Sequence, residues 1–199
     1  ILIILSVIIT GYIINYSIFL IRNKSEIVPN KIFYLSLYQS TLSIVCFLTL
    51  IIGFIFSDFS LITVFQNSHS LKPLFYKISG TWGNHEGSLL LWINILVMFS
   101  FLFLILNKSA QTTYRIYTLL TQNILIIGFF IFLLFNSNPF NLVFPIPNEG
   151  LGLNPILQDP ALAIHPPLLY IGFVGSSIYF SAAIASLLSN FRGKFFAKS

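Results

Sequence analysis

The stretch SLLLWINILVMFSFLFLIL, residues 88–106, contains no Asp, Glu, Lys, Arg or His. As an α-helix rising about 1.5 Å per residue, a run of this length crosses the hydrocarbon layer of a bilayer, which is about 30 Å thick. Four more runs without those residue types lie at residues 1–21, 32–56, 116–135 and 167–188. Because a helix satisfies its own backbone hydrogen bonds in lipid, the sequence predicts an all-α polytopic membrane protein with about five transmembrane helices in a single membrane domain.

The composition excludes a water-soluble globular protein. Of the 199 residues, 56% are apolar or aromatic and 8% are charged, and the mean hydropathy is +0.90, whereas a soluble domain carries about 25% charged residues. The cations behind the net charge of +5 are scattered between apolar runs, which disfavours nucleic-acid binding. The single cysteine, Cys46, lies inside an apolar run, so the sequence holds no internal disulfide, no CxxC pair and no CxxCH haem-attachment site.

The first apolar run differs from a secretory signal peptide. It has neither a basic start nor a cleavage site with small residues, so we expect it to be retained as a span. Phe, Tyr, Ile, Asn and Lys are used heavily in the chain, and Ala and Arg sparingly. Such a bias is expected from AT-rich coding, as in many organellar genomes, and hints at a mitochondrial origin.

The connecting segments predict the orientation, because Lys and Arg are retained on the side from which the chain is inserted. Segments 22–31 and 107–115 and the C-terminal tail fall on one side of the predicted spans. They hold eight of the ten cations: Arg22, Lys24, Lys31, Lys108, Arg115, Arg192, Lys194 and Lys198. The other side has two long outer segments, 57–87 and 136–166, which we expect to face the intermembrane space or the periplasm.

The two outer segments have unusual compositions. Segment 136–166 contains six prolines, whose fixed φ and missing N–H predict a stiff, irregular platform without regular helix or sheet. Segment 57–87 ends in three glycines that allow another part of the chain to approach closely: Gly80, Gly83 and Gly87. For its two cations, Lys72 and Lys77, two interpretations are open, namely binding of anionic propionates or phosphates and snorkelling at the membrane surface.

His165 is the first candidate for chemistry. It precedes Pro166 and Pro167, which we expect to open the fifth helix, because proline suits the first helical turn. Pro166 also biases His165 toward an extended backbone, so we expect the imidazole at the membrane surface, beside the start of the helix. Two interpretations are open: an interfacial histidine hydrogen-bonded to a carbonyl, or a ligand of a metal or haem iron.

His85 is the second candidate. It lies in TWGNHEGS, residues 81–88, directly before the third span, for which Ser88 is the expected N-cap. Trp82 is an amphipathic ring of the kind that settles at membrane interfaces. The stretch is either an anchoring turn or part of a ligand site, and no second His or Cys stands at helical metal-ligand spacing. His69 lies in a polar stretch, and we expect it to be a solvated loop residue.

Two further patterns concern the outer segment and the fifth span. Glu149 and Asp159 are a conceivable carboxylate pair for acid–base work, but the proline-rich chain between them leaves their separation unpredictable. The fifth span carries small residues at spacings of three to four, a pattern that lets helices approach closely in lipid: Gly172, Gly175, Ser176, Ala182, Ala183 and Ser186. We expect this stripe to pack against another helix.

Two segments carry a family resemblance: KISGTWGNHEGSLLLW, residues 77–92, and GLNPILQDPALAIHPPLLY, residues 152–170. Both closely resemble the amino-terminal part of CcmF, the haem lyase subunit of the multicomponent cytochrome c maturation pathway, and their order and spacing fit as well. The resemblance implies a membrane protein that holds haem b near the outer face and supports its covalent attachment to the CxxCH thiols of apocytochrome c. In that family the histidine of the second segment is an axial haem ligand, which implies that His165 binds the iron.

The same resemblance implies a cofactor site that includes His165, Pro166 and Trp82, with His85 as a lesser candidate. The sequence stops before the tryptophan-rich haem platform and the second axial histidine of the family, so it resembles the amino-terminal piece of the split versions in some mitochondria. The implied partners are the other chains of a split lyase, apocytochrome c, a haem-delivery chaperone and the lipid bilayer. The implied location is the mitochondrial inner membrane or, alternatively, the bacterial plasma membrane.

The same residues also bear on two other function classes. A subunit of a respiratory complex that translocates protons needs ionisable residues at membrane depth, and the five predicted spans contain no Lys, Glu, Asp or His. A transporter typically binds its substrate where Gly or Pro breaks a helix, whereas the prolines are expected to avoid the spans. A structural membrane subunit of a respiratory complex, without haem chemistry, stays open as the alternative function.

Overall fold

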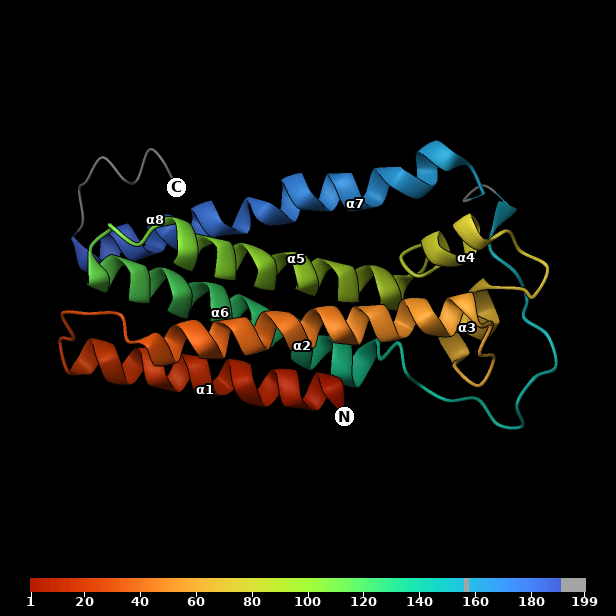
Figure 1. Cartoon of the computed structure of the whole chain (residues 1–199), viewed down its shortest axis with the longest axis horizontal. Helices are drawn as coiled ribbons and strands as arrows, with labels where there is room; N and C mark the ends of the chain where they lie inside the picture. The colour runs from red at the N-terminus through yellow and green to blue at the C-terminus, as the bar shows by residue number, and fades with distance from the viewer. Residues whose placement is uncertain (156–157, 191–199) are drawn as a thin grey trace.

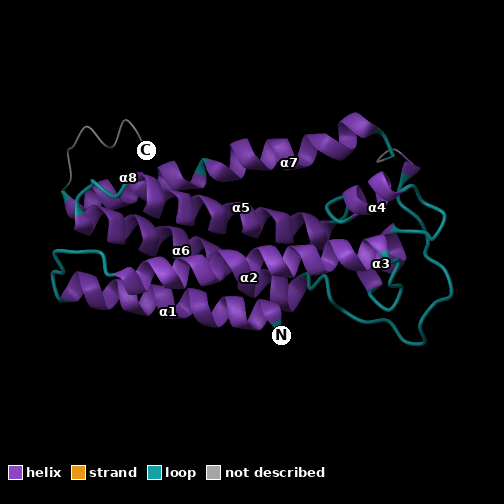
Figure 2. Cartoon of the chain, in the orientation of Figure 1, coloured by secondary structure: helices purple, strands orange, loops and turns teal. Residues whose placement is uncertain are grey.

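The computed structural model describes residues 1–155 and 158–190, and this part of the chain consists of helices joined by turns and loops (Figures 1 and 2). Five helical segments within it are long and apolar enough to cross a membrane: α1 (Leu2–Arg22), α2 (Asn30–Ile55), α5 (His85–Leu106), α6 (Thr112–Asn136) and the pair α7 (Pro160–Gly175) and α8 (Ser177–Ser189). Two short helices lie between α2 and α5: α3 (Ile62–Asn67) and α4 (Leu74–Gly80). The predicted all-α polytopic membrane fold is confirmed.

The helices run back and forth, so the bundle has two ends of different character (Figure 1). We name the two ends after the predicted orientation. At the inner end the α1–α2 and α5–α6 loops meet, and the Thr112 hydroxyl donates to the Glu26 carbonyl at 2.7 Å. At the outer end, α3, α4 and the chain between α6 and α7 form a layer of short helices and loops. The two basic connecting segments thus share one end, as predicted, while three tail cations lie outside the described residues: Arg192, Lys194 and Lys198.

α6 lies at the centre of the bundle, where it packs against α1, α5 and α8, while α2 packs against α1 and α5. Large apolar side chains of α2, α5 and α6 form the main core: Leu50, Phe54, Leu90, Ile93, Ile126, Phe130 and Leu133. Other large apolar side chains are exposed around the outside, including Ile8, Phe19 and Ile52. Helices that are apolar on every face are typical of membrane spans.

Two glutamine side chains join the helices inside this apolar interior. Gln39 of α2 donates to the Thr10 hydroxyl of α1 at 2.8 Å and to the Asn123 carbonyl oxygen of α6 at 2.9 Å. Gln122 of α6 donates to one serine hydroxyl of α8 at 2.9 Å and accepts from another at 2.7 Å. Because an interhelical hydrogen bond in lipid contributes about 0.6 kcal/mol on average, the two glutamines help fix α1, α2 and α8 to α6.

The two outer segments form one layer. A short antiparallel pairing joins Leu61 to Leu142, with two backbone hydrogen bonds of 2.9 Å around it. Further along, the N–H of Leu151 donates to the Phe65 carbonyl at 2.8 Å. The proline-rich segment is therefore held in place by backbone hydrogen bonds to the segment that contains α3.

The fifth span begins at Pro160 rather than at the predicted Pro167. Asp159 is its N-cap, and its Oδ1 accepts hydrogen bonds from the N–H groups of Ala161 and Leu162 at 2.8 and 3.1 Å. Pro160 occupies the first turn, where its missing N–H has no partner to lose. The expectation that the whole proline-rich outer segment lacks regular helix is therefore wrong for its last residues.

His165 is consequently a helical residue, not the extended one predicted. Pro166 and Pro167 lie inside α7, and Ser176 separates α7 from α8 after Gly175. The expectation that the prolines avoid the spans, which counted against a transporter, is also wrong. The outer half of the fifth span carries one histidine, His165, and three prolines: Pro160, Pro166 and Pro167.

Candidate functional site

The glycine-rich turn between α4 and α5 forms one wall of the candidate site. The Oδ1 atom of Asn84 accepts the N–H of Gly87 at 2.8 Å and caps α5, which therefore begins at His85. The prediction of Ser88 as the N-cap is wrong. A Cβ on Gly87 would lie 1.6 Å from the carbonyl oxygen of Thr81, which confirms the predicted close approach of backbone in this turn.

Trp82 binds a backbone carbonyl that a proline leaves without its helical partner. In a regular helix the Ala163 carbonyl accepts the N–H of the residue four positions later, but that residue is Pro167, which has no N–H. The indole N–H of Trp82 donates to the Ala163 carbonyl at 2.8 Å. The Trp82 ring also stacks on Phe47 of α2, with centroids 6.5 Å apart. We call this arrangement the Trp82 contact; it links α7 to the α4–α5 turn and to α2.

Tyr170 makes a second contact between α7 and α5. Its hydroxyl lies 2.6 Å from the hydroxyl of Ser88, and its ring packs against Trp92 with centroids 5.4 Å apart. We call this the Tyr170 contact. Because Ala163 and Tyr170 are about two helical turns apart, the two contacts hold the outer half of α7 at two points, one on each side of His165.

A pocket of about 320 Å³ lies between α7 and the α4–α5 turn. Both walls contribute side chains, among them Trp82, His85, Ser88, Leu162, Pro166 and Tyr170. The structure therefore brings together three of the four predicted site residues, Trp82, His85 and Pro166. His85 is exposed on the first turn of α5 and reaches this pocket from the side opposite α7.

His165 does not line this pocket. The pocket is lined by Leu162, Pro166 and Tyr170 of one α7 face, and a helical rotation of about 100° per residue places His165 about 100° from the middle of that face. Its side chain is exposed, and within residues 1–155 and 158–190 it has no hydrogen bond or ion pair. Both ring nitrogens of His165 are therefore available to a ligand.

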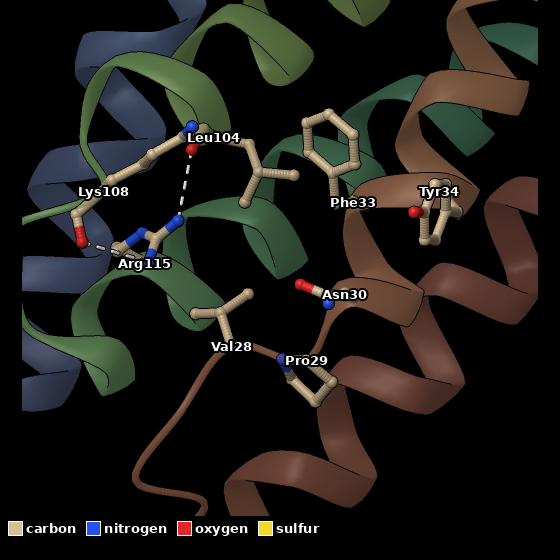
Figure 3. Close-up of a pocket in the computed structure, with 8 residues that line it drawn as sticks. All are labelled: Val28, Pro29, Asn30, Phe33, Tyr34, Leu104, Lys108 and Arg115. Atoms are coloured by element: carbon tan, nitrogen blue, oxygen red, sulfur yellow. Dashed lines mark hydrogen bonds between the residues drawn. The ribbon is translucent and has the colours of Figure 1, made fainter.

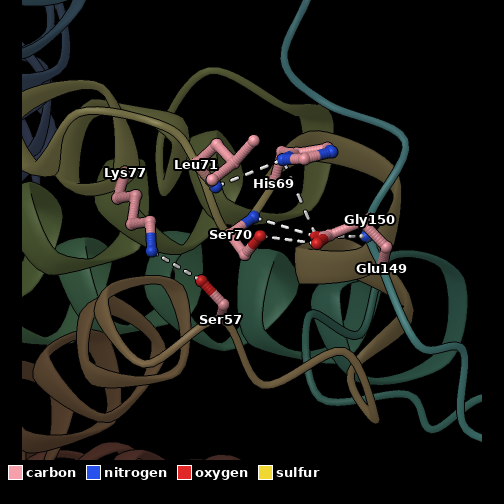
Figure 4. A network of polar contacts seen from close by, with 7 residues as sticks. All are labelled: Ser57, His69, Ser70, Leu71, Lys77, Glu149 and Gly150. Atoms are coloured by element: carbon pink, nitrogen blue, oxygen red, sulfur yellow. Dashed lines mark hydrogen bonds and ion pairs between the residues drawn. The ribbon is translucent and has the colours of Figure 1, made fainter.

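His69 differs from the solvated loop residue that was predicted. Its Nδ1 accepts the N–H of Leu71 at 3.2 Å and lies 3.8 Å from Oε1 of Glu149 (Figure 4). His69 is thus part of the contact between the two outer segments, on the outer layer and outside the set of residues that line the pocket.

Glu149 joins the two outer segments (Figure 4). Its carboxylate accepts the N–H of Ser70 at 2.9 Å, the hydroxyl of Ser70, and the N–H of Gly150 at 3.0 Å. The hydrogen bonds from Ser70 and then Gly150, with a smaller contribution from the charge of His69, lower the pKa of Glu149 to about 2. Glu149 and Asp159 serve separate roles, because Asp159 caps α7.

The two lysines of the outer layer bind neighbouring groups of the same layer. Nζ of Lys72 donates to the Asn67 carbonyl at 3.0 Å, and Nζ of Lys77 donates to the Ser57 hydroxyl at 2.7 Å (Figure 4). Burial lowers the pKa of Lys72 to about 8, and the nearby charge of Lys77 acts in the same direction. Neither lysine lines the pocket.

The surroundings of His165 fit a porphyrin, which needs an imidazole for its iron and apolar side chains against its ring. Ile164, Leu168 and Leu169 on the same helix are 52%, 63% and 46% exposed. Leu168 and Leu169 follow His165 by three and four residues, which places them beside it on the helix surface. Among the described residues, no group of three or more His, Cys, Asp or Glu side chains is arranged to hold a bare metal ion.

Sequence reasoning missed several residues that position the site, among them Asp159, Asn84 and Tyr170. Asp159 directly precedes a proline, which is a start signal for a helix, so its role was readable. Asn84 was also readable as an N-cap, because it stands directly before the helix and its amide can accept an N–H of the first turn. For the pairing of Ser88 with Tyr170, 82 residues apart, the sequence holds no local signal.

Comparisons with known proteins identify the family. The family model for the cytochrome C assembly protein matches residues 82–198. The cytochrome c-type biogenesis protein CycK of Rhizobium meliloti is 49% identical over 153 residues, which cover 73% of this chain and 23% of that protein. The cytochrome c-type biogenesis protein CcmF of Escherichia coli is 42% identical over 144 residues, which cover 72% of this chain and 22% of that protein. The chain thus spans less than a quarter of the length of these curated relatives.

A solved structure shares the fold. The structure of the cytochrome c heme lyase CcmF superposes with a TM-score of 0.76 over 95% of this chain and 30% of that chain, at 20% sequence identity. At this sequence identity the structural similarity shows the fold alone, and the family assignment comes from the sequence matches. The chain is a multi-pass membrane protein that belongs to the CcmF type of the cytochrome c assembly protein family.

Proposed function

We propose that this chain forms the part of a CcmF-type haem lyase that holds haem b at the outer end of the bundle, with His165 as an axial ligand of the iron. The observation that carries the proposal is the exposed imidazole of His165, which has no hydrogen-bond or ion-pair partner among the described residues and lies on a helix held at two points. The names of the relatives, which refer to cytochrome c biogenesis and to a heme lyase, support the same function.

The contribution of this chain is to position the cofactor. The Trp82 contact and the Tyr170 contact hold the α7 backbone on either side of His165. An imidazole carried by a backbone that is already fixed loses little conformational freedom when it binds a ligand. Trp82, His85 and Pro166 form the adjoining pocket, and we propose that they contact the cofactor beside its iron ligand.

When bound, haem b supplies the vinyl groups to which the CxxCH thiols of apocytochrome c become attached. Holding the reacting groups together converts an encounter into an intramolecular step, which contributes up to about 7 to 11 kcal/mol. In this proposal the side chains of this chain hold and orient the haem, and the thiols come from apocytochrome c. We propose that the tryptophan-rich platform and the second axial histidine come from other chains of a split lyase and that a chaperone delivers the haem.

The proposed location is an energy-transducing membrane with the outer layer on the side where cytochrome c matures. The relatives named above come from bacteria, which favours the bacterial plasma membrane over the mitochondrial inner membrane predicted from composition. In that membrane the layer formed by α3, α4 and the proline-rich segment faces the periplasm.

Absorption spectroscopy of the chain assembled with its lyase partners tests the proposal. His165→Ala should lower the haem content of the purified complex and remove its low-spin spectrum, and His165→Gly should regain that spectrum when imidazole is added. The matched control is His69→Ala, which removes an outer-layer imidazole that does not line the pocket. Unchanged haem content in His165→Ala, or an equal loss in His69→Ala, contradicts the ligand assignment.

The same measurement distinguishes the proposed lyase function from the alternative function. A structural subunit of a respiratory complex, without haem chemistry, predicts that the wild-type assembly carries no haem that depends on any of these histidines. The proposed lyase function predicts haem in the wild type that His165→Ala loses. His85→Ala should then cause a smaller loss, because His85 lines the pocket but is not the proposed iron ligand.

A further inference from the structure

A second pocket, of about 450 Å³, lies at the inner end of the bundle (Figure 3). It is bounded by the start of α2 on one side and by the α5–α6 hairpin on the other. Its lining includes Pro29, Asn30, Phe33, Leu104, Lys108 and Arg115. The proposed haem-holding function uses none of these residues, since it belongs to the opposite end of the bundle.

The pocket carries two positive charges that the described residues leave unbalanced. Arg115 donates from Nη2 to the Leu104 carbonyl at 3.1 Å and from Nη1 to the Lys108 carbonyl at 3.4 Å, and its buried Nε has no partner (Figure 3). These acceptors are neutral. Among the described residues no carboxylate lines the pocket or lies within ion-pair distance of Arg115 or Lys108. A half-buried guanidinium in this setting favours an anionic ligand.

The start of α2 adds to the positive potential of the same pocket. α2 begins at Asn30 after Pro29, and no side chain caps its first turn. The first N–H groups of a helix lack intrahelical acceptors and carry a partial positive charge, so they favour anions. The helix start and the two cations therefore act in the same direction.

The apolar part of the lining comes from the ends of two candidate spans, α2 and α5. Phe33 and Tyr34 are in the first two turns of α2, and Leu104 is in the last turn of α5. Figure 3 shows Leu104 beside Lys108 and Arg115, with Phe33 and Tyr34 on the α2 side of the view, across from the two cations. A ligand in the pocket thus meets positive charge and apolar side chains together at the ends of the candidate spans α2, α5 and α6.

We propose that this pocket binds the phosphate-bearing headgroup of an anionic phospholipid such as phosphatidylglycerol. Lys108 and Arg115 face the phosphate, and Phe33 and Tyr34 lie against the glycerol and the upper acyl chains. Basic pockets between transmembrane helices are suited to anionic headgroups for this reason. A free phosphate ion shares the charge of the headgroup but has nothing to place against the apolar lining, so the lipid is the better match.

Native mass spectrometry of the full chain with mixed phosphatidylglycerol and phosphatidylcholine tests the proposal by the lipid that each protein ion retains. The wild type should retain phosphatidylglycerol in preference. Lys108→Gln should lower that retention about five-fold, the change that corresponds to about 1 kcal/mol for one cation near an anionic headgroup. Arg115→Gln should lower it at least as much. Arg22→Gln is the matched control, because Arg22 is an exposed cation of the inner end that does not line the pocket.

Lys108→Gln keeps the test valid even if Arg115→Gln disturbs the α5–α6 hairpin, because the Lys108 side chain is exposed. Unchanged phosphatidylglycerol retention in both pocket variants overturns the proposal. A loss of retention in Arg22→Gln equal to that in the pocket variants also overturns it, because it would indicate that the lipid is attracted to all the cations of the inner end. Inorganic phosphate added as a competitor separates the two sources of the charge. Displacement of phosphatidylglycerol by inorganic phosphate overturns the lipid assignment, and retention in its presence supports it.

Discussion

The two halves of the fifth span are held in place by different means. α8 is embedded in the bundle, because its Ser181, Ala182 and Ala185 are buried. The side-chain amide of Gln122 in α6 donates one hydrogen bond to α8 and accepts another from it. α7 packs mainly against α5 and leaves most of its large apolar side chains exposed. In Figure 1, α8 follows α5 and α6, whereas α7 diverges from α5 toward the outer end.

This difference predicts which changes lower the stability of the bundle and which move α7 alone. α8 is fixed by buried small residues and by hydrogen bonds to α6, so changes there should loosen α8 and lower the free energy of unfolding. The half that carries His165 is fixed by the Trp82 contact and the Tyr170 contact at its surface. Changes to these contacts should move His165 while the bundle stays folded.

The largest effect is expected at the junction of the two halves. A Cβ on Gly175 would lie 2.6 Å from the ring of Phe99, whereas a Cβ on Gly172 would meet nothing within 4 Å. Gly175→Val should therefore lower the free energy of unfolding by about 3 kcal/mol, the upper end for overpacking, and Gly172→Val should lower it little. Thermal unfolding in detergent measures both. Equal losses in the two variants would show that the junction is not tightly packed.

The next effect concerns the hydrogen bonds that Gln122 of α6 makes to α8 and α5. Gln122→Leu removes hydrogen bonds to Ser177, Ser181 and the Leu96 carbonyl, and at about 0.6 kcal/mol for each bond the loss is about 2 kcal/mol. Hydrogen exchange of α8 should accelerate. Gln39→Leu is the control, because it breaks the bonds among α1, α2 and α6 and should leave α8 protected. Acceleration of α8 in both variants would refute a local role for Gln122.

A smaller and more local effect is expected from the Trp82 contact. Trp82→Phe keeps an aromatic ring but removes the N–H donor to the Ala163 carbonyl, a loss of about 1 kcal/mol. Hydrogen exchange should accelerate in α7 and stay unchanged in α8. Pro167→Ala should weaken the same contact, because the new N–H competes for the Ala163 carbonyl. Unchanged exchange of α7 in both variants would mean that the contact does not position this helix.

The smallest effect is a pH dependence of the outer layer. The pKa of Glu149 is lowered from 4.5 to about 2, chiefly by its hydrogen bonds to Ser70. The stabilising contribution of the Glu149 carboxylate is therefore fully present above about pH 4.5 and is lost as the pH falls through about 2. Limited proteolysis of the outer segments as a function of pH should show increasing cleavage over that window. Glu149→Gln should abolish the dependence, and a variant that keeps it would assign the effect to another group.

The spans could be predicted from the sequence because the bilayer demands long apolar helices. α1, α2 and α6 begin and end within a few residues of the predicted limits. The start of the fifth span was also readable, since Asp159 before Pro160 is an N-cap followed by a first-turn proline. The prediction assigned the first turn to Pro166 and Pro167 instead, because the prolines before them were interpreted as a continuous loop.

The contacts that position the site could not be predicted, because they join residues far apart in the chain. Trp82 and Ala163 are 81 residues apart, and Ser70 and Glu149 are 79 apart. Local patterns set the helix limits, while these pairings depend on how α7 and the outer segments pack. The predicted stripe of small residues shows the same limit, since Gly175 and Ala182 are buried as expected while Gly172 is exposed.

The placement of His165 is tested most directly by labelling His165→Cys with a membrane-impermeant thiol reagent in sealed vesicles. The native Cys46 is buried and should not react. The structure predicts that position 165 is labelled from the same side as Ser70→Cys of the outer layer, and that Ser109→Cys of the inner end is labelled from the opposite side. Labelling of position 165 from the side of Ser109→Cys, or from neither side, would contradict an exposed histidine at the outer end of the bundle.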